Sequence, residues 1–578
     1  MELTGAEIVA ECLLREKVDL VFGLPGGVVI PLYDVLRRTP KIRHILVRHE
    51  QGAAHMADGY ARATGKPGVC IVSSGPGATN TVTGIATAYM DSIPMVIFTG
   101  QVPVHLIGND AFQEADIVGI TRPITKHNYL VKEAGEIADA IAEAFYIATT
   151  GRPGPVLIDL PKDVQVMKAK FEYPERPHVR GYRPTYEGHP GQIKKAVEMI
   201  VASKRPVIYV GGGAILSGAA DEVRDLAYRA RAPVTTTLMG LGAFPETDSL
   251  SLKMLGMHGT WYANTAVMQC DLLIAIGARF DDRVTGKLSD FSLQSKKIHI
   301  VIDPADIGKN VQVDLPIVGD VKRVLQQLNP LITKPLGTDE WLQQIEVWKR
   351  EHPLTYESTA SCHEEGLDGG SDGTAPPSHI PLRAQYVIQK IGEMTHGDAI
   401  VVTDVGQHQM WAAQWYGFTK PRSMITSGGL GTMGFGLPAA IGVAFAVKDR
   451  PIVVISGDGS IQMNIQEMAT AVGCRLPIKI ALLNNGYLGM VRQWQDLFYG
   501  KRFSEVDLRE SNPDFVKLAE AFGAVGLRVF KDEDVEEAFA EAMKVTDRPV
   551  LIDFVIGEED NVFPMIPAGA AAHEMRES

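Results

Sequence analysis

Short apolar runs alternate with longer amphipathic stretches along most of the chain, and this alternation predicts repeated strand–helix units. In the first part of the sequence the apolar runs lie at 68–73, 95–99 and 155–160, and a helical pattern covers 134–148. Short runs of this kind are typical of strands that are buried on both faces of a parallel sheet. We therefore expect an α/β protein built on doubly wound parallel sheets.

Three α/β blocks are predicted, followed by a short tail, and their limits are 1–170, 190–335, 380–557 and 558–578. A polar link rich in Pro and Tyr, 171–190, separates the first two blocks. A predicted helix at 341–350 precedes a Gly- and Ser-rich segment, 358–379, whose composition is typical of a flexible surface linker. The acidic amino terminus enters a helical pattern at once, so neither a signal peptide nor a transit peptide is predicted.

Composition and charge narrow the classes of function. The chain has 578 residues, 45% of them hydrophobic and 22% charged, as in ordinary globular proteins. A net charge of −13 argues against nucleic acid as a main partner, because no basic excess exists to neutralise phosphates. The apolar run 437–447 is too short to span a bilayer, so no membrane partner is expected. The five cysteines, widely spaced and odd in number, predict reduced thiols in a cytoplasmic protein.

A glycine-rich turn, Gly457-Asp458-Gly459-Ser460, follows the apolar run 451–456. Its glycines let the chain turn sharply and leave room for the phosphates of a ligand, while Asp458 offers a hard oxygen ligand. A second apolar run, 478–483, delivers Asn485 to the same edge of the sheet. Two protein oxygens beside a diphosphate suit Mg²⁺. At this spacing the pattern resembles the signature of the thiamine diphosphate fold.

Glu50 lies just after a predicted strand and at the head of a helix of small residues. On its own, this position is also explained by a capping or surface glutamate. The glycine-rich loops 24–27 and 73–78 lie at ends of strands in the same block, and the segment 110–114 adds Asp, Gln and Glu. Together these features have the pattern of the pyrimidine-binding half of thiamine enzymes.

Over nearly all of its length the chain resembles the catalytic subunits of the acetohydroxyacid synthase (acetolactate synthase) family, of the anabolic, flavin-containing kind. The resemblance implies three domains of the thiamine diphosphate-enzyme type, which bind pyrimidine, FAD and diphosphate with Mg²⁺ in chain order. The motifs that carry it are Pro25-Gly26-Gly27, Arg48-His49-Glu50-Gln51-Gly52, Ala88-Tyr89-Met90-Asp91-Ser92, Gly100-Gln101-Val102-Pro103, Ala111-Phe112-Gln113-Glu114-Ala115-Asp116, Asp159-Leu160-Pro161-Lys162-Asp163, Arg279-Phe280-Asp281-Asp282-Arg283, Gly406-Gln407-His408-Gln409-Met410-Trp411 and Gly431-Thr432-Met433-Gly434-Phe435-Gly436.

The resemblance implies how thiamine diphosphate and Mg²⁺ are held. Glu50 would bond the pyrimidine ring nitrogen, and burial would favour its protonated form. Met433 would lie under the two rings and enforce the bend of the cofactor. Asp458, Asn485 and the main-chain oxygen of Tyr487 would hold Mg²⁺. The other implied contacts with this cofactor are Pro25, Val405, Gly406, Gln407, His408, Gly431, Gly457, Gly459, Ser460, Gly489 and Met490, with Gln407 and His408 at the diphosphate.

The implied reaction decarboxylates pyruvate and condenses the hydroxyethyl carbanion-enamine with pyruvate or 2-oxobutanoate. It gives 2-acetolactate or 2-aceto-2-hydroxybutanoate in branched-chain amino acid (Val, Leu, Ile) biosynthesis. Gln113, Lys162 and the Gly27 amide would line the acceptor side. Arg283 would pair with the second carboxylate, and Trp494 would meet the extra methyl of 2-oxobutanoate, a contact that discriminates by about 1–3 kcal/mol. Alternatives remain: Lys162 as a surface charge, Arg283 as a salt bridge in the flavin loop, and Trp494 as core.

FAD is implied for the middle block, where Gly211-Gly212-Gly213 follows a strand and opens a helix. The turn lacks the GxGxxG fingerprint, so these glycines alone are equally explained by strand–helix packing. The segment 279–283 favours flavin, because flavin-free relatives lack it. The implied FAD contacts are Arg152, Gly211, Gly212, Gly213, Thr237, Leu238, Met257, His258, Gly277, Arg279, Asp303 and Asp320.

A homodimer or dimer of dimers is implied, in which Glu50 of one chain faces the third block of its neighbour. A small regulatory subunit is a common further partner in the family.

Two alternative functions, of different classes, remain. One is another thiamine diphosphate-dependent 2-oxo acid decarboxylase, oxidase or acetyltransferase. The other is a non-catalytic regulatory homologue, against which the presence of Glu50, Asp458 and Asn485 argues. Val28 departs from the Ala of most relatives, and this departure concerns inhibitor sensitivity more than chemistry.

Overall fold

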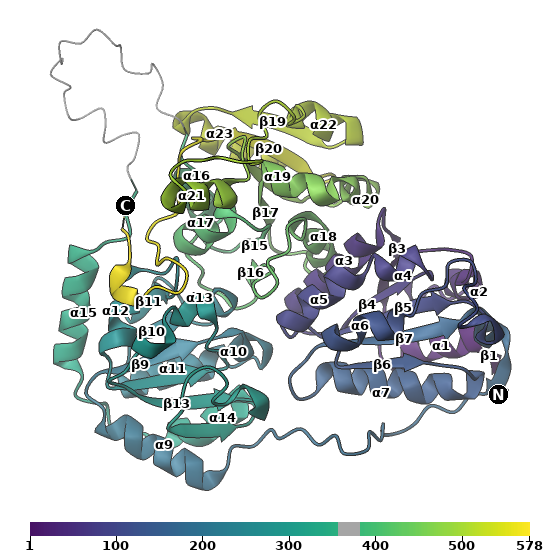
Figure 1. The fold of residues 1–578 in the computed structure, drawn as a ribbon, viewed down its shortest axis with the longest axis horizontal. Helices are drawn as coiled ribbons and strands as arrows, with labels where there is room; N and C mark the ends of the chain where they lie inside the picture. Colours follow the sequence, from purple (N-terminus) through teal and green to yellow (C-terminus); the bar gives the residue numbers. More distant parts are fainter. Residues whose placement is uncertain (357–381, 578) are drawn as a thin grey trace.

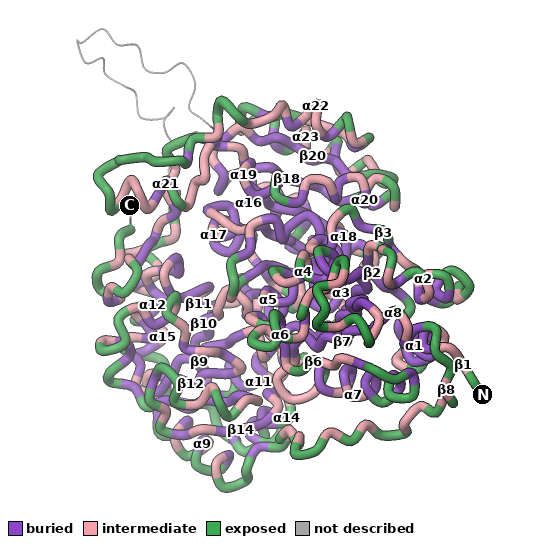
Figure 2. The backbone as a smooth tube through the Cα atoms, turned by 45° about the vertical axis from the view of Figure 1, so that its right-hand side comes forward, coloured by how far each residue is buried: buried purple, intermediate pink, exposed green. Residues whose placement is uncertain are grey.

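Three six-stranded sheets form the framework of the computed structural model, which describes residues 1–356 and 382–577 (Figure 1). Every strand pairing inside these three sheets is parallel. Buried residues fill the sheets and the inner sides of the helices, as Figure 2 shows. Apolar clusters lie on both faces of each sheet, so the prediction of doubly wound parallel sheets is confirmed.

The first sheet has the strand order β3-β2-β4-β5-β7-β6. Its strands are β2 (Leu20–Leu24), β3 (Arg43–Leu46), β4 (Gly68–Val72), β5 (Met95–Gln101), β6 (His127–Leu130) and β7 (Pro155–Pro161). Because successive side chains of a strand face opposite sides, Val69 and Cys70 join different cores. Helices α1 (Gly5–Arg15), α2 (Ile30–Arg37) and α7 (Ile137–Thr149) cover the Val69 side, and α3 (Glu50–Thr64), α5 (Val82–Met90) and α6 (Ile117–Thr121) cover the Cys70 side.

The middle sheet has the order β11-β10-β9-β12-β13-β14. Its strands are β9 (Pro206–Val210), β10 (Val234–Thr236), β11 (Ser251–Met254), β12 (Leu272–Ile276), β13 (Lys296–Val301) and β14 (Leu315–Val318). Ile208 packs on one face with α9 (Pro190–Ala202), α10 (Gly212–Leu216), α11 (Ala220–Ala230) and α14 (Val321–Leu328). Tyr209 packs on the other face with α12 (Trp261–Gln269) and α15 (Asp339–Glu351).

The third sheet has the order β16-β15-β17-β18-β20-β19. Its strands are β15 (Ile400–Thr403), β16 (Met424–Ile425), β17 (Ile452–Gly457), β18 (Lys479–Asn484), β19 (Val525–Val529) and β20 (Val550–Val555). Val453 packs with α16 (Ala384–Met394), α17 (Gln407–Trp415) and α23 (Val535–Lys544), and Val454 packs with α18 (Gly436–Ala446), α20 (Met468–Gly473) and α22 (Phe515–Phe522). The short α19 (Asp458–Ile461) directly follows β17, and α21 (Gly489–Phe498) comes after β18.

The first and third blocks share one apolar core, although they lie far apart in the sequence. Helix α3 packs against α18, and residues of both helices belong to the same buried cluster. The two backbones approach closely: a Cβ added to Gly59 would lie 2.2 Å from the Ala439 carbonyl oxygen, and one added to Gly442 would lie 1.9 Å from that of Met56. Glycine is therefore required at both crossing points.

Most predicted elements are found within one or two residues of their expected limits. The helical pattern expected at the start of the chain is wrong for the first residues. Glu2–Thr4 forms strand β1, which pairs antiparallel with β8 (Lys168–Lys170), and α1 begins only at Gly5. The two-stranded ribbon depends on a partner distant in sequence, which a local helical pattern cannot reveal. The predicted linker 358–379, with Cys362, lies outside the described residues. Within 1–356 and 382–577, no helix combines the length and the apolar character needed to cross a bilayer.

Candidate active site

A cavity of about 980 Å³ lies where the three blocks meet. Its walls include 28 of the residues predicted for cofactors, metal and substrates. From the middle block and its neighbourhood these are Arg152, Gly211, Gly212, Gly213, Thr237, Leu238, Met257, His258, Gly277, Arg279, Arg283, Asp303 and Asp320. From the third block they are Val405, Gly406, Gln407, His408, Gly431, Met433, Gly457, Asp458, Gly459, Ser460, Asn485, Tyr487, Gly489, Met490 and Trp494.

Oxygen donors gather at the carboxyl ends of β17 and β18, which are neighbours in the sheet. Asp458 begins α19, and Asn485 directly follows β18. The Asp458 carboxylate accepts a 2.7 Å hydrogen bond from Asn512, and Asn485 Oδ1 lies 3.1 Å from the Tyr487 amide nitrogen. Burial raises the pKa of Asp458 to about 6, because the site offers its negative charge little solvation. A bound divalent cation would offset that cost, so this corner fits Mg²⁺.

The neighbouring wall fits a diphosphate. His408 is buried, and its Nε2 has no hydrogen-bond partner among the described residues. Burial lowers the pKa of His408 to about 3, so the ring is neutral and carries a single N–H. A Cβ on Gly489 would lie 2.1 Å from Gln407 Oε1, and one on Gly457 would lie 2.8 Å from the His408 ring. The glycines therefore let both side chains line the cavity.

Met433 belongs to a loop that two buried carboxylates bind, one near each end. Asp404 accepts hydrogen bonds from the backbone of Gly434 at 2.7 Å and Gly436 at 3.3 Å. Asp91 of the first block binds the loop upstream of Met433. The Met433 side chain lies toward the Asp458 corner, because a Cβ on Gly459 would be 4.0 Å from Met433 Cε.

The middle-block wall carries charged and polar groups around Arg152. Its guanidinium donates to Ser92 Oγ at 2.8 Å and lies 3.4 Å and 3.7 Å from the carboxylates of Asp306 and Asp303. His258 Nδ1 is buried without a partner among the described residues, and burial lowers the pKa of this ring to about 4. These groups and the size of the cavity fit a nucleotide-like cofactor such as FAD.

The three glycines of the middle block are weaker evidence for a bound cofactor than the polar wall is. A Cβ on Gly211 would lie 2.4 Å from the Gly277 carbonyl oxygen, and one on Gly213 would lie 2.7 Å from the Gly277 Cα. Packing against Gly277 therefore requires glycine at both positions, with or without a ligand. The alternative reading of these glycines as packing residues holds for this pair.

Arg283 and Trp494 lie at the rim of the same cavity. Three-fifths of the Arg283 side chain is exposed, and its guanidinium lies 3.5 Å from Asp282, so the salt-bridge alternative and a binding role are both compatible with its position. Trp494 is half-buried beside Phe498, with the ring centroids 5.1 Å apart. Trp494 is thus a wall residue rather than core.

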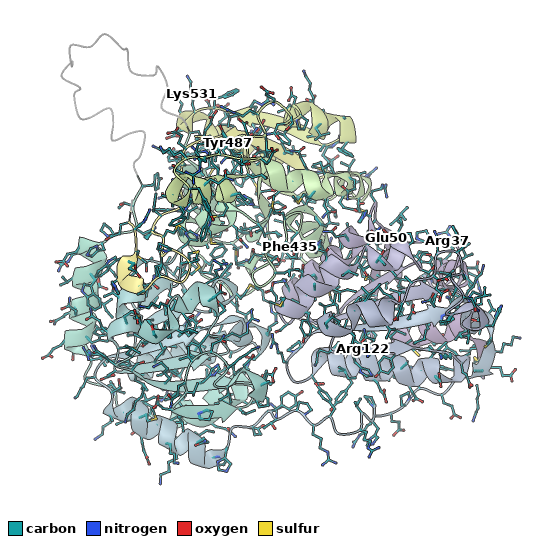
Figure 3. All side chains as sticks on the ribbon, in the orientation of Figure 1. Arg37, Glu50, Arg122, Phe435, Tyr487 and Lys531 are labelled. Atoms are coloured by element: carbon teal, nitrogen blue, oxygen red, sulfur yellow. The ribbon has the colours of Figure 1, made fainter. Side chains whose placement is uncertain are left out.

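Five predicted site residues lie outside this cavity: Glu50, Pro25, Gly27, Gln113 and Lys162. They follow strands of the first sheet or contact the loops that do, at its carboxyl edge. Figure 3 shows Glu50 at the edge of the first block, well apart from Tyr487. Glu50 is buried and accepts a 2.9 Å hydrogen bond from Asn80, whereas the other four are exposed. One chain therefore presents two separate half-sites.

Sequence reasoning missed several polar residues of the cavity wall, above all Arg62 and Asp91. Asp91 occurs in a motif that carries the family resemblance, but no role followed from it. Asp58 and Arg62 form an i, i+4 ion pair on a helix of mainly small apolar residues. That pair on a buried helix is the signal that could have indicated a polar network.

The sequence matches three family models described as thiamine pyrophosphate enzyme domains: the N-terminal TPP binding domain over 3–120, the central domain over 193–328 and the C-terminal TPP binding domain over 404–554. It is 50% identical to "Acetolactate synthase" of Mycobacterium bovis over 100% of this chain and 91% of that protein. It is 48% identical to "Acetolactate synthase isozyme 3 large subunit" of Escherichia coli and to "Acetolactate synthase large subunit" of Haemophilus influenzae, over 99% of this chain and 98% of each relative.

The chain belongs to the acetolactate synthase family of thiamine pyrophosphate enzymes. Its three sheets correspond in order to the three domains of that family. The residues of the Glu50 half-site and of the Asp458 corner fall within the ranges matched as TPP binding domains, except Lys162, which lies between the N-terminal and central matches. The resemblance stated from motifs is confirmed over the whole chain.

Proposed function

We propose that the chain is the catalytic subunit of an acetolactate synthase in branched-chain amino acid biosynthesis. It decarboxylates pyruvate and condenses the two-carbon product with pyruvate or 2-oxobutanoate, giving 2-acetolactate or 2-aceto-2-hydroxybutanoate. The observation that carries the proposal is the corner formed by Asp458, Asn485 and Tyr487 in the cavity, together with a buried Glu50 in the separate half-site of the first block. Relatives that share half of its residues bear the name of this activity.

Bound thiamine diphosphate supplies the carbanion chemistry and the electron sink that decarboxylation needs. Asp458, Asn485 and the Tyr487 carbonyl hold Mg²⁺, while Gln407 and His408 contact the diphosphate. Met433 supports the rings of the cofactor, and Glu50 exchanges a proton with the pyrimidine nitrogen. The apolar parts of the cavity exclude water.

Arg283 pairs with the carboxylate of the second 2-oxo acid, and Trp494 contacts its alkyl end. Gln113, Lys162 and the Gly27 amide orient the acceptor carbonyl. Arg152, with the other predicted contacts of the middle block, holds FAD. The reaction has no net redox step, so its overall balance requires no electrons from the flavin.

We also propose that two copies of the chain complete each site. The support is that Glu50 lies outside the cavity that contains the Asp458 corner, and well apart from Tyr487 of that corner within one chain (Figure 3). The first block also exposes large apolar side chains near its half-site: Phe112 is 87% and Ile30 is 60% exposed. Such apolar surface is typical of protein–protein contacts. The relatives named as large subunits support a small-subunit partner, and the site chemistry requires neither membrane nor nucleic acid.

The assay that tests this function uses dialysed protein and returns thiamine diphosphate, Mg²⁺ and FAD singly and together. Products are analysed with pyruvate alone and with added 2-oxobutanoate. We expect acetolactate and acetohydroxybutanoate only when thiamine diphosphate and Mg²⁺ are both present. Acetaldehyde or acetyl phosphate as the main product indicates one of the related decarboxylases, oxidases or acetyltransferases. A washed, colourless protein with full activity rules out the FAD assignment.

A further inference from the structure

The loop 426–435, called here the Met433 loop, joins β16 to α18 and has no regular secondary structure. It forms part of the cavity wall through Gly431 and Met433. A loop has no helical or sheet hydrogen bonds to fix its path, so the position of Met433 depends on the groups that bind its backbone. Arg62 and Asp91 of the first block bind the loop backbone at positions 426, 428 and 429. Gln409, Asp404 and Asn464 of the third block bind it at positions 427 and 434.

Asp91 is the C-cap residue of α5, and its carboxylate binds two successive amides of the Met433 loop. Oδ2 lies 3.0 Å from the Gly428 nitrogen, and Oδ1 lies 2.7 Å from the Gly429 nitrogen. The contact leaves no space for a side chain, because a Cβ on Gly429 would lie 2.9 Å from Asp91 Oδ1. One carboxylate thus fixes both the position and the direction of this peptide.

Arg62 of α3 binds both Asp91 and the Met433 loop. Its guanidinium pairs with Asp91 at 2.9 Å and donates to the Thr426 carbonyl oxygen at 2.8 Å. Its charge also lies 5.3 Å from the centroid of the Phe435 ring, at the other end of the loop. The side chains of Arg62 and Asp91 are almost fully buried, so water does not compete for these bonds.

Asp58 takes part in the same network without touching the loop. It pairs with Arg62 on α3, and its side chain is fully buried. Thr87 of α5 forms a separate anchor, a 2.7 Å hydrogen bond between its hydroxyl and that of Thr432. The network therefore contains one carboxylate that binds the loop, one that does not, and an independent hydroxyl contact next to Met433.

We propose that Asp91 is a positioning residue for the reaction: it holds the Met433 loop so that the Met433 side chain supports the rings of thiamine diphosphate. This inference rests on the proposed function, because it takes the cofactor role of Met433 from there. Asp91 acts through the backbone of Gly428 and Gly429 and does not contact the reacting atoms. The first block thus shapes the wall of its own chain's cavity, in addition to carrying the Glu50 half-site.

The test compares D91N with D58N, because both remove one buried carboxylate charge from the same ion cluster and only the first loses a contact with the loop. Amide hydrogen exchange is followed for 424–435 in the cofactor-free protein. The asparagine amide can accept from only one of the two glycine amides, so we expect exchange at 428–433 to accelerate about tenfold or more in D91N. D58N should change this segment by less than about threefold. Equal acceleration in both variants overturns the proposal.

A second readout is calorimetric binding of thiamine diphosphate with Mg²⁺ in excess. We expect the Kd to rise about tenfold in D91N and to change little in D58N. Should D91N fold poorly, T87V removes only the hydroxyl anchor beside Met433 and is expected to give a smaller effect in the same direction. In a double-mutant cycle with M433A, the D91N effect on proton exchange at the reactive carbon of bound cofactor should largely disappear. Additive effects overturn the role of Asp91.

These outcomes also separate the inference from the function on which it rests. A wild-type protein that takes up no thiamine diphosphate overturns the proposed function. Normal uptake and normal loop exchange in both the wild type and D91N overturn only the role given to Asp91.

Discussion

The carboxylate of Glu467 lies 2.9 Å from the backbone nitrogen of His49, so a side chain of the third block holds the start of the helix that carries Glu50. The same oxygen, Oε1, accepts the Arg48 amide at 2.9 Å, and Oε2 accepts the Thr470 hydroxyl at 2.7 Å. Glu467 is fully buried. Its carboxylate satisfies two donors that precede the first turn of α3 and would otherwise lack partners.

Replacing Glu467 with Ala should destabilise the fold more than a typical substitution does. The partly buried amides of Arg48 and His49 lose their acceptor, and an unmet donor costs up to about 1–3 kcal/mol when it is buried. We expect a loss of at least about 2 kcal/mol in the free energy of urea unfolding, followed by circular dichroism. T470V removes only one of the three hydrogen bonds and should cost about 1 kcal/mol. A smaller loss in E467A than in T470V contradicts this account.

Replacing Glu50 with Gln should stop proton exchange at the reactive carbon of bound thiamine diphosphate. The amide keeps the size of the side chain and can still contact Asn80, but it cannot exchange a proton with the pyrimidine. General acid–base groups contribute about 10²–10⁴-fold, so we expect a loss in that range. Quenched deuterium exchange read by NMR measures it, with circular dichroism as the check on folding. An exchange rate within about threefold of the wild type is incompatible with the role of Glu50.

Shortening Trp494 to Ala should change the choice of second substrate. The indole lines the cavity, and removing it deletes the apolar wall that the methyl of 2-oxobutanoate would contact. Selectivity for 2-oxobutanoate over pyruvate should fall about 10–200-fold, measured as the ratio of the two products in competition. F498A is the matched control, since Phe498 packs on Trp494 but does not line the cavity. An unchanged ratio in W494A removes Trp494 from the specificity site.

Asp159 should give the stability a pH dependence that is unusual for a carboxylate. Burial raises its pKa to about 7, despite hydrogen bonds from Thr99 and Gln101. Between the unfolded pKa of about 3.9 and about 7, the folded protein holds a proton that the unfolded chain releases. This contribution to stability is therefore lost as pH rises through that window.

In D159N this loss is absent, so the stability of the variant relative to the wild type should increase from pH 5 to pH 8. Urea unfolding at the two pH values measures the difference, and any constant cost of the substitution cancels in the comparison. A relative stability that stays constant over the same range would show that the Asp159 carboxyl is already ionised in the fold.

The parts of the site that local sequence could predict are those in which a motif follows a strand. Asp458 and Asn485 end adjacent parallel strands, and parallel strands bring their carboxyl ends to one edge, so their meeting follows from two short patterns. Glu50 at the head of α3 was predicted on the same ground, and His49 is indeed the N-cap. The limits of the buried strands followed from their apolar runs.

Contacts between blocks could not be predicted in this way. The hydrogen bond from Gly429 to Asp91 joins residues 338 positions apart. The local sequence around either residue does not indicate the other. The same is true of the β1–β8 ribbon, whose first strand stands where a helical pattern was expected at the amino terminus. In these cases tertiary pairing overrides the local pattern. The cavity itself exists only because three chain segments converge.

The common core beneath α3 and α18 has a consequence for how the molecule comes apart. The middle block has two clusters of its own, but its residues Leu241 and Met254 also belong to a cluster of the third block. The outer blocks cannot separate without exposing the Gly59–Ala439 and Gly442–Met56 crossings to water. Heating should therefore melt the two ends of the polypeptide together as one cooperative unit. Translation produces the amino-terminal third of the chain first, but this third becomes stable only after the last third has been synthesised.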